Sequence, residues 1–183
     1  MSLKDNYNLK RIKEHMIKVL QNPKTRQYVQ FKDWVFSSWI PWYWDNGTIL
    51  TIEDGLIHDG HENFGFNFHT LLSGPGDAKY SIESSMKVKE AYVVLDEIIK
   101  ANDLDVDVVY RMGINCVHPT VNNLPAFEHV DHSFPHKNML IYMSDTDGDT
   151  VVGEDRHSPV EDEIIIFEGK HYHHPPTFGR RIV

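Results

Sequence analysis

The sequence predicts an α+β fold in which helices come first and an antiparallel barrel or sandwich follows. Two early segments, 8–21 and 82–100, space their apolar residues three and four apart, which is typical of amphipathic helices. From residue 104 onward the apolar residues alternate with others or form short buried runs, and turn signals such as Asp147-Gly148 separate these pieces. A change from the helical to the strand period along the chain is typical of the α+β class.

Each predicted helix has an end that the sequence explains. The helix over 8–21 ends at Asn22-Pro23, because the residue before a proline is pushed out of the α region. The helix over 82–100 ends at Asn102-Asp103. The apolar face of the first helix consists of Leu9, Ile12, Met16, Val19 and Leu20.

The strands are predicted from alternation and from one continuous apolar run. Residues 104–110 and 139–143 alternate as half-buried strands do. Residues 163–167 read EIIIF, which is typical of a strand buried on both faces. A last strand is expected over 180–183.

All four tryptophans fall within residues 34–44, a segment that Pro41 interrupts. Such rings either cover the core or form a wall of a substrate pocket. Trp42 and Trp44 are the candidates for the second role.

Length and composition predict one domain, because 183 residues fall in the usual range for a single core. We expect a helical and aromatic support region over 1–103 and a β core over 104–183. The net charge of −9 disfavours nucleic acid as a partner, since the surface repels phosphates. No apolar run reaches the roughly 18 residues of a membrane span, so no membrane association is expected.

The single cysteine, Cys116, excludes a disulfide within the chain and a cysteine-based zinc site. The polar, lysine-containing N-terminus does not have the pattern of a signal peptide. We therefore expect a cytoplasmic protein. Its oligomeric state cannot be read from the sequence.

Two histidine-containing segments predict a metal site. His129 and Asp131 are two residues apart, so in an extended segment they point to the same side. A cluster of His171, His173 and His174 follows the buried strand 163–167 and a turn. Two imidazoles and one carboxylate on one face of an octahedron leave three positions open, as in non-haem iron(II) oxygenases. The residues leave open which histidine of the cluster takes part.

Two arginines close to the C-terminus complete the pattern. Arg180 and Arg181 follow the histidine cluster by a few residues. A guanidinium is a planar fork that can bind a carboxylate through two hydrogen bonds. If the last strand runs beside the metal, one arginine could hold the far carboxylate of a dicarboxylic acid.

With these motifs in order, the stretch from Tyr110 to Val183 resembles the catalytic core of 2-oxoglutarate and Fe(II)-dependent oxygenases, close to the prolyl 4-hydroxylase-like branch. The matching segments are 128–152 and 163–183. The resemblance implies a double-stranded β-helix, that is, a jelly-roll or cupin-like core, with N-terminal helices packed on it. It also makes 104–183 the catalytic region.

The resemblance further implies a set of residue roles. His129, Asp131 and His173 would bind Fe(II), with His171 and His174 as alternatives, and Arg181 or Arg180 would bind 2-oxoglutarate. Tyr142 and, more weakly, Tyr110 match co-substrate contacts, and His132 and His136 are candidates for contact with the substrate.

The implied reaction couples oxidative decarboxylation of 2-oxoglutarate by O₂ to hydroxylation of a small molecule, a free amino acid or a peptidyl residue. Ascorbate is a candidate reductant. The alternative is a cupin-like metal-binding barrel with another activity, such as an isomerase.

Overall fold

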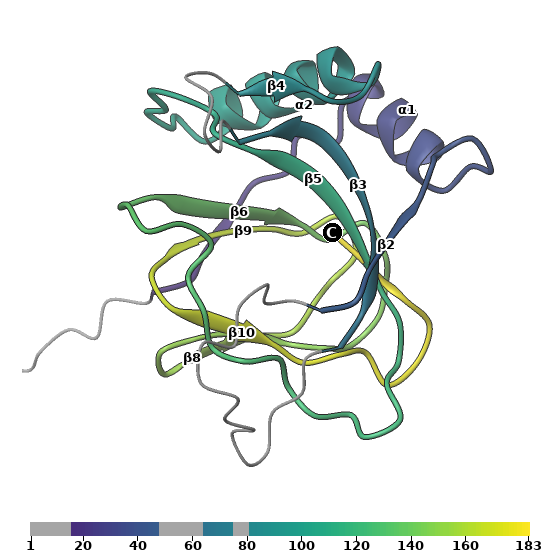
Figure 1. The fold of residues 1–183 in the computed structure, drawn as a ribbon. Helices are drawn as coiled ribbons and strands as arrows, with labels where there is room; N and C mark the ends of the chain where they lie inside the picture. The colour runs from purple at the N-terminus through teal and green to yellow at the C-terminus, as the bar shows by residue number, and fades with distance from the viewer. Residues whose placement is uncertain (1–15, 48–63, 75–80) are drawn as a thin grey trace, which may run out of the picture.

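The computed structural model describes residues 16–47, 64–74 and 81–183. Within these ranges the chain forms two helices and eleven strands, arranged in three antiparallel sheets (Figure 1). The fold is thus α+β and mostly strand, as the sequence predicts.

The largest sheet has the order β11-β5-β3-β2, and β4 pairs with the C-terminal end of β3. Its strands are β2 (Tyr43–Asp45), β3 (Phe66–Ser73), β4 (Ile82–Glu83), β5 (Met112–Val117) and β11 (Arg181–Ile182). The pairing of β11 with β5 sets Arg181 opposite Val117 and brings the end of the chain into the middle of the fold.

A second sheet has the order β1-β9-β6, formed by β1 (Lys18–Leu20), β9 (Ile164–Glu168) and β6 (Lys137–Ile141). The central strand β9 is the predicted apolar run. Ile164 and Ile165 point to opposite faces and both have no exposed surface, so β9 is buried on both sides.

The third sheet, β10-β7-β8, positions the histidine cluster. Its strands are β7 (Thr150–Val152), β8 (Asp155–His157) and β10 (His171–His173). A two-residue turn joins β7 to β8, and Gly153 has the positive φ of 57° that such tight hairpins require.

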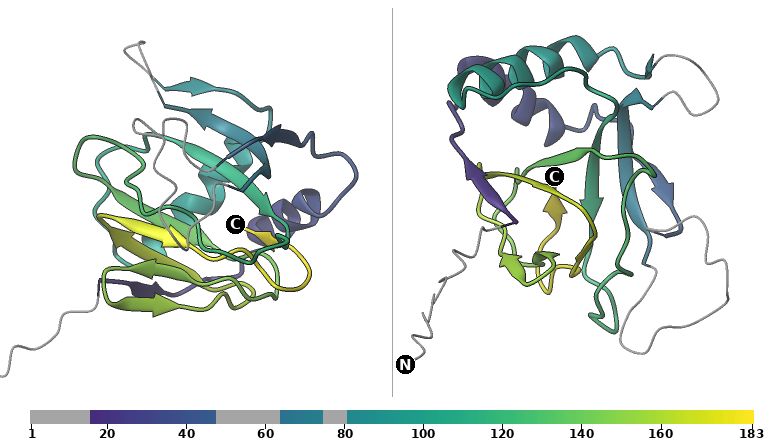
Figure 2. Two further views of the ribbon diagram at one scale, coloured as in Figure 1. Left: turned by 60° about the horizontal axis from the view of Figure 1, so that its bottom comes forward. Right: turned by 90° about the vertical axis from the view of Figure 1, so that its left-hand side faces the viewer.

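Helices α1 (Arg26–Val35) and α2 (Val88–Ala101) pack against each other, and α2 contacts β3. Figure 1 shows both helices on one side, next to β3 and β5, and the right-hand view of Figure 2 shows the same side uppermost. The main core lies between these helices and the strands; among its members are Phe31, Val94, Ile98, Ile114 and Ile164. Neither helix is long and apolar enough to cross a membrane, among the residues described.

Three predicted elements differ from the structure: the two helices and the strand over 104–110. Residues 18–20 of the predicted first helix form strand β1, and residues 8–15 lie outside the described ranges. Residues 82 and 83 pair as β4, so α2 begins only at Val88.

Residues 104–110 form no strand, although their side chains alternate. Leu104 packs against the core, but Val106 and Val108 are exposed, as are Asp105 and Asp107, so the alternation in sequence corresponds to no buried face. The strand in this part of the chain is β5, from Met112 to Val117.

The sheets contain strands from both the expected support region, 1–103, and the expected β core, 104–183. The early strands β1 and β3 pair with β9 and β5, so residues from both regions build the same sheets.

Candidate metal centre

Main-chain hydrogen bonds hold two of the predicted histidines together. His129 N–H donates to the His171 carbonyl at 2.9 Å, and His171 N–H donates to the His129 carbonyl at 3.0 Å. The two residues form an isolated antiparallel bridge, and directly opposite residues of such a pair have side chains on the same face. Their ring centroids are 4.5 Å apart. The backbone thus fixes the pair across 42 residues of sequence (171 − 129).

Asp131 adds a carboxylate to this pair. Val130 points to solvent and is 45% exposed, so His129 and Asp131 share the opposite side of the extended segment. The Asp131 carboxylate oxygens lie 4.0 Å from His129 Nε2 and 3.7 Å from His171 Nε2. Ligand atoms of His129, Asp131 and His171 all lie within 4.8 Å of one another, as a metal site requires.

The second nitrogen of each imidazole is occupied by a main-chain acceptor. His129 Nδ1 lies 2.8 Å from the Phe127 carbonyl, and His171 Nδ1 lies 3.2 Å from the Gly169 carbonyl. A carbonyl accepts only, so Nδ1 carries the proton and the neutral ring keeps a lone pair at Nε2. This is the arrangement usual for metal-binding histidines. Burial, and then the nearby His129, lowers the pKa of His171, which favours the neutral ring.

His173, the first choice from the sequence, lies beside this group but not in it. It is on the same side of β10 as His171, with ring centroids 5.1 Å apart, but its ring is 6.2 Å from that of His129. Its Nδ1 shares a 3.0 Å hydrogen bond with Thr150 Oγ1. His174 contacts the ring of Tyr172. Neither His173 nor His174 belongs to the group formed by His129, Asp131 and His171.

Thr150 is a functional candidate that the sequence did not indicate. Its Oγ1 bonds both His173 Nδ1 and, at 2.8 Å, the hydroxyl of Tyr142. Thr150 lies opposite His173 in the β7–β10 register, so only the strand pairing could have revealed it. Tyr142 has no exposed surface, and burial raises its pKa to about 12. The chain Tyr142–Thr150–His173 therefore fixes the orientation of the His173 ring.

The structure separates the two arginines. Arg180 is exposed, whereas Arg181 is 4% exposed and lines the same cavity as the histidines. Arg181 donates from one terminal nitrogen to the carbonyls of Gly148 (2.7 Å) and His174 (3.0 Å).

The charge of Arg181 is not neutralised by an ion pair with any residue the structure describes, and its Nε has no hydrogen-bond partner there. Burial lowers its pKa. The nearby carboxylate of Asp149 raises that pKa, but it forms its ion pair with Arg156. A buried guanidinium without an ion-pair partner is costly, and an anionic ligand would relieve that cost.

Gly148, singled out in the sequence as a turn, allows this anchoring. Its φ is +98°, and a side chain there would lie only 2.8 Å from the His174 carbonyl. Glycine alone fits both conditions. The loop can therefore approach His174 closely enough for Arg181 to bind both carbonyls.

Three other predicted residues form a ring cluster on the cavity wall. Tyr110, His132 and His136 all line the cavity, together with Phe134. His132 stacks on Phe134 at an interplanar angle of 2°, and Tyr110 meets His132 edge-on. Burial, followed by the charges of His136 and Arg111, lowers the pKa of His132.

The two tryptophans proposed for the pocket lie elsewhere. Trp42 packs against the main core, and Trp44 is 60% exposed with its indole N–H bonded to Asn46. Neither lines the cavity. Within the described residues, Trp34 and Trp42 of the aromatic segment pack against the core, Trp39 and Trp44 are exposed, and none of the four lines the cavity.

The cavity itself has a volume of about 880 Å³, which lies in the range of small-molecule sites. His129, Asp131, His171, His173 and Arg181 all contribute to its lining. A divalent cation, an anion beside Arg181 and a further molecule could therefore share one enclosed space.

Comparison with known proteins adds no family to this geometry. No family model, no curated protein and no solved structure matches the chain. The side chains alone define the chemistry: two neutral imidazoles and a carboxylate can bind a cation, and a buried guanidinium next to them can bind an acid.

Proposed function

We propose that this chain is a non-haem iron(II) oxygenase that uses 2-oxoglutarate as co-substrate. The observation that carries the proposal is the convergence of His129, Asp131 and His171 in a cavity that also contains the unpaired Arg181. We also propose that the three sheets form a double-stranded β-helix. Their antiparallel pairing supports this topology.

The donor set fits iron(II). Imidazole nitrogen suits iron, and a single carboxylate offsets part of its charge. Metal–ligand bonds of about 2.0–2.2 Å place neighbouring donors about 3 Å apart. The separations of 3.7 and 4.0 Å exceed that by about 1 Å at most, which side-chain rotation can close.

We assign the second metal-binding histidine to His171 and not to His173. Its Nε2 faces Asp131, and its Nδ1 proton is held by a main-chain carbonyl. His173 is held by Thr150 and lies further from His129. In this assignment His173 lies next to the metal and helps to shape the site.

Arg181 fits the far carboxylate of 2-oxoglutarate. It lines the same cavity as the histidine group, and after burial its charge has the largest effect in lowering the pKa of His173. The two carbonyls that it already binds fix its position without neutralising it. Tyr142 is a neighbour of Arg181, and its hydroxyl shares a hydrogen bond with Thr150. It therefore helps to position the side chains in this part of the site.

The protein contributes binding, orientation and exclusion of water. When bound, iron and 2-oxoglutarate supply with O₂ the oxidising power needed to hydroxylate an unactivated C–H bond. The carbonyls of Phe127 and Gly169 hold the imidazole protons at Nδ1, so Nε2 stays available to the metal. Arg181 orients the acid, and the surrounding apolar walls keep the cavity dry.

A test of the proposal measures succinate formed from 2-oxoglutarate by the full chain, reconstituted with Fe(II) without oxygen and then exposed to air. Turnover should require Fe(II), and Asp131→Ala should abolish both turnover and metal binding. The matched control is Asp96→Ala, an exposed aspartate on α2 that pairs only with Lys100. Full turnover by Asp131→Ala would contradict the proposal.

One observation favours a different function. Arg181 already has a structural role, since it joins the Gly148 loop to His174, and this role needs no ligand. A cupin-like barrel that binds metal for another reaction would therefore have the same arginine. Calorimetry distinguishes the two, because such a protein would bind the metal and give no heat with 2-oxoglutarate.

A further inference from the structure

The cavity continues from the metal group into an apolar chamber. Five apolar residues that pack against the main core are only partly buried, and all five line the cavity: Leu104, Met112, Met139, Ile141 and Ile166. These five residues give the cavity an apolar wall beside the main core. Apolar walls with few polar groups are characteristic of sites for small organic molecules.

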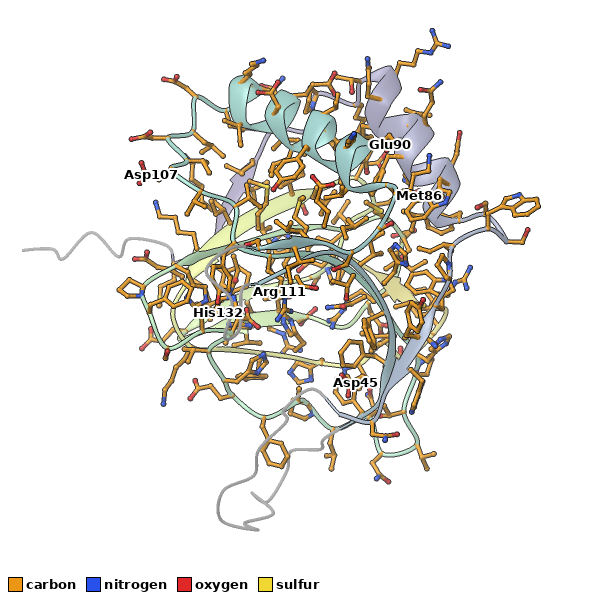
Figure 3. All side chains as sticks on the ribbon, turned by 45° about the horizontal axis from the view of Figure 1, so that its top comes forward. Asp45, Met86, Glu90, Asp107, Arg111 and His132 are labelled. Carbon is orange, nitrogen blue, oxygen red and sulfur yellow. The ribbon has the colours of Figure 1, made fainter. Side chains whose placement is uncertain are left out.

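Charged groups divide this chamber into two ends. Arg111 lines the cavity beside His132, whose pKa it lowers, and Figure 3 shows the two side chains next to each other. The opposite charge gathers on the segment before β5, where Asp103, Asp105 and Asp107 line the cavity edge. Asp107 lies at the margin of the molecule in Figure 3, away from Arg111.

Arg111 has no carboxylate partner among the residues the structure describes. Its guanidinium is exposed, and a guanidinium presents five N–H donors in a fixed fork. An arginine fork binds carboxylates and phosphates through paired hydrogen bonds.

We propose that the chamber binds a small amphipathic acid, with its carboxylate or phosphate on Arg111 and its apolar body against Leu104, Met139 and Ile166. The acids at the other end repel an anion, so they set the orientation of the molecule. A neutral apolar molecule would leave Arg111 unpaired, and a cation would be drawn to Asp105 and Asp107 instead.

Calling this molecule the substrate rests on the proposed oxygenase function, but the binding itself does not. The acid on Arg111 is distinct from 2-oxoglutarate on Arg181, because Arg181 is buried and anchored to Gly148 and His174, while Arg111 opens to the chamber. The chain thus offers two cationic anchors, one for each organic molecule.

The test measures binding of three probes to the metal-free full chain by calorimetry and by NMR titration: hexanoate, hexyl phosphate and hexanamide. The two anions should bind at least about tenfold more tightly than the neutral amide, the difference expected for a charge-assisted contact. Resonances of Tyr110, Arg111 and Met139 should shift, while those of Arg181 and Ile182 should not.

Arg111→Gln should lower hexanoate affinity by about tenfold and make it similar to that of hexanamide. Arg111→Lys keeps the charge but loses the fork, so it should retain part of the difference. The matched control is Arg26→Gln, which removes one exposed arginine from the start of α1, outside the cavity. This control should bind hexanoate as the unchanged protein does.

Three outcomes would overturn the proposal: equal binding of hexanoate and hexanamide, unchanged affinity in Arg111→Gln, or shifts confined to the residues around Arg181. Because the protein carries no metal in this assay, the outcome is independent of turnover. Asp131→Ala gives the converse test of independence. If it loses turnover and still binds hexanoate, the acid site at Arg111 is independent of the oxygenase function.

Discussion

At the scale of single residues, the metal centre depends on which imidazole nitrogen is free. His171 holds its Nδ1 proton on the Gly169 carbonyl and directs Nε2 to Asp131, whereas His173 bonds through Nδ1 to Thr150. We expect His171→Ala to abolish stoichiometric binding of Fe(II), or of Co(II) as a stable substitute, in anaerobic calorimetry. His173→Ala should retain binding with about 10–100-fold lower affinity, as for residues that support a ligand indirectly.

An exposed histidine provides the control for this pair. His118→Ala removes an imidazole that bonds Asn67 outside the cavity, so metal affinity should not change. If His173→Ala lost the metal and His171→Ala kept it, the assignment would reverse in favour of the histidine that the sequence resemblance selects.

The two arginines allow a second prediction at this scale. Arg181→Gln should weaken 2-oxoglutarate binding at least tenfold without removing the metal, because it takes away the one buried arginine of the described residues, whose charge would hold the far carboxylate. Arg180→Gln changes an exposed side chain and should leave the affinity unchanged. Calorimetry on the metal-loaded protein measures both, and thermal unfolding checks that Arg181→Gln still folds.

Sequence reasoning reached His129, Asp131 and Arg181 because each belongs to a local pattern of residue types. It could not choose between His171 and His173. Both lie on the same side of β10, since side chains alternate along a strand, so local spacing treats them alike. The choice comes from the main-chain bridge between His129 and His171, a contact between distant segments that leaves no mark in the residues themselves.

At the scale of elements, Asp162 joins helix α1 to the turn before β9. It accepts a hydrogen bond from Tyr28 at 2.6 Å and pairs with Lys32 at 2.5 Å and with Lys24 at 3.1 Å. Burial alone would raise the pKa of Asp162, but the hydrogen bonds from Lys32, Tyr28 and Lys24 outweigh it and lower the pKa to about 2. The ionised carboxylate is therefore part of the folded structure.

Since the pKa of Asp162 is lower in the folded chain, the unfolded chain binds the extra proton as the pH falls. The stability that Asp162 contributes is complete above pH 4 and is lost between about pH 4 and pH 2. Asp162→Asn should cost about 1–2 kcal/mol at pH 7, after allowance for solvent screening. Asparagine accepts the positive φ of 67° at this position, so the substitution tests the charge. Urea unfolding at pH 7 and pH 2.5 should show the difference between the two proteins shrink at low pH.

The elements that the sequence missed are explained by contacts that no local pattern contains. Helix α1 had usable signals, because Thr25 caps it by accepting from the Tyr28 N–H and its buried residues Tyr28, Phe31 and Val35 have helical spacing. Strand β1 gave no such signal: Val19 is 52% exposed, and the segment is extended because it pairs with β9.

At the scale of the whole molecule, the metal centre joins parts of the chain that no sheet connects. His129 and Asp131 precede β6 of one sheet, His171 belongs to β10 of another, and Arg181 begins β11 of the third. A metal ion held by His129, Asp131 and His171 would tie the segment before β6 to β10 in the folded state alone. Metal binding and global stability should therefore be coupled.

At a free metal concentration 100 times the dissociation constant, this coupling should add about 2.7 kcal/mol, which for a chain of this length raises the melting temperature by about 5–10 °C. The measurement compares thermal unfolding of the chain with Co(II) and with a chelator, under nitrogen. His171→Ala should show no rise, because it lacks a ligand, whereas His118→Ala should rise as the unchanged protein does. An equal rise in His171→Ala would mean that the ion stabilises the fold from some other place, since unfolded histidines that bind metal lower the shift and cannot raise it. Only a shift that disappears with His171 supports a centre that ties the segment before β6 to β10.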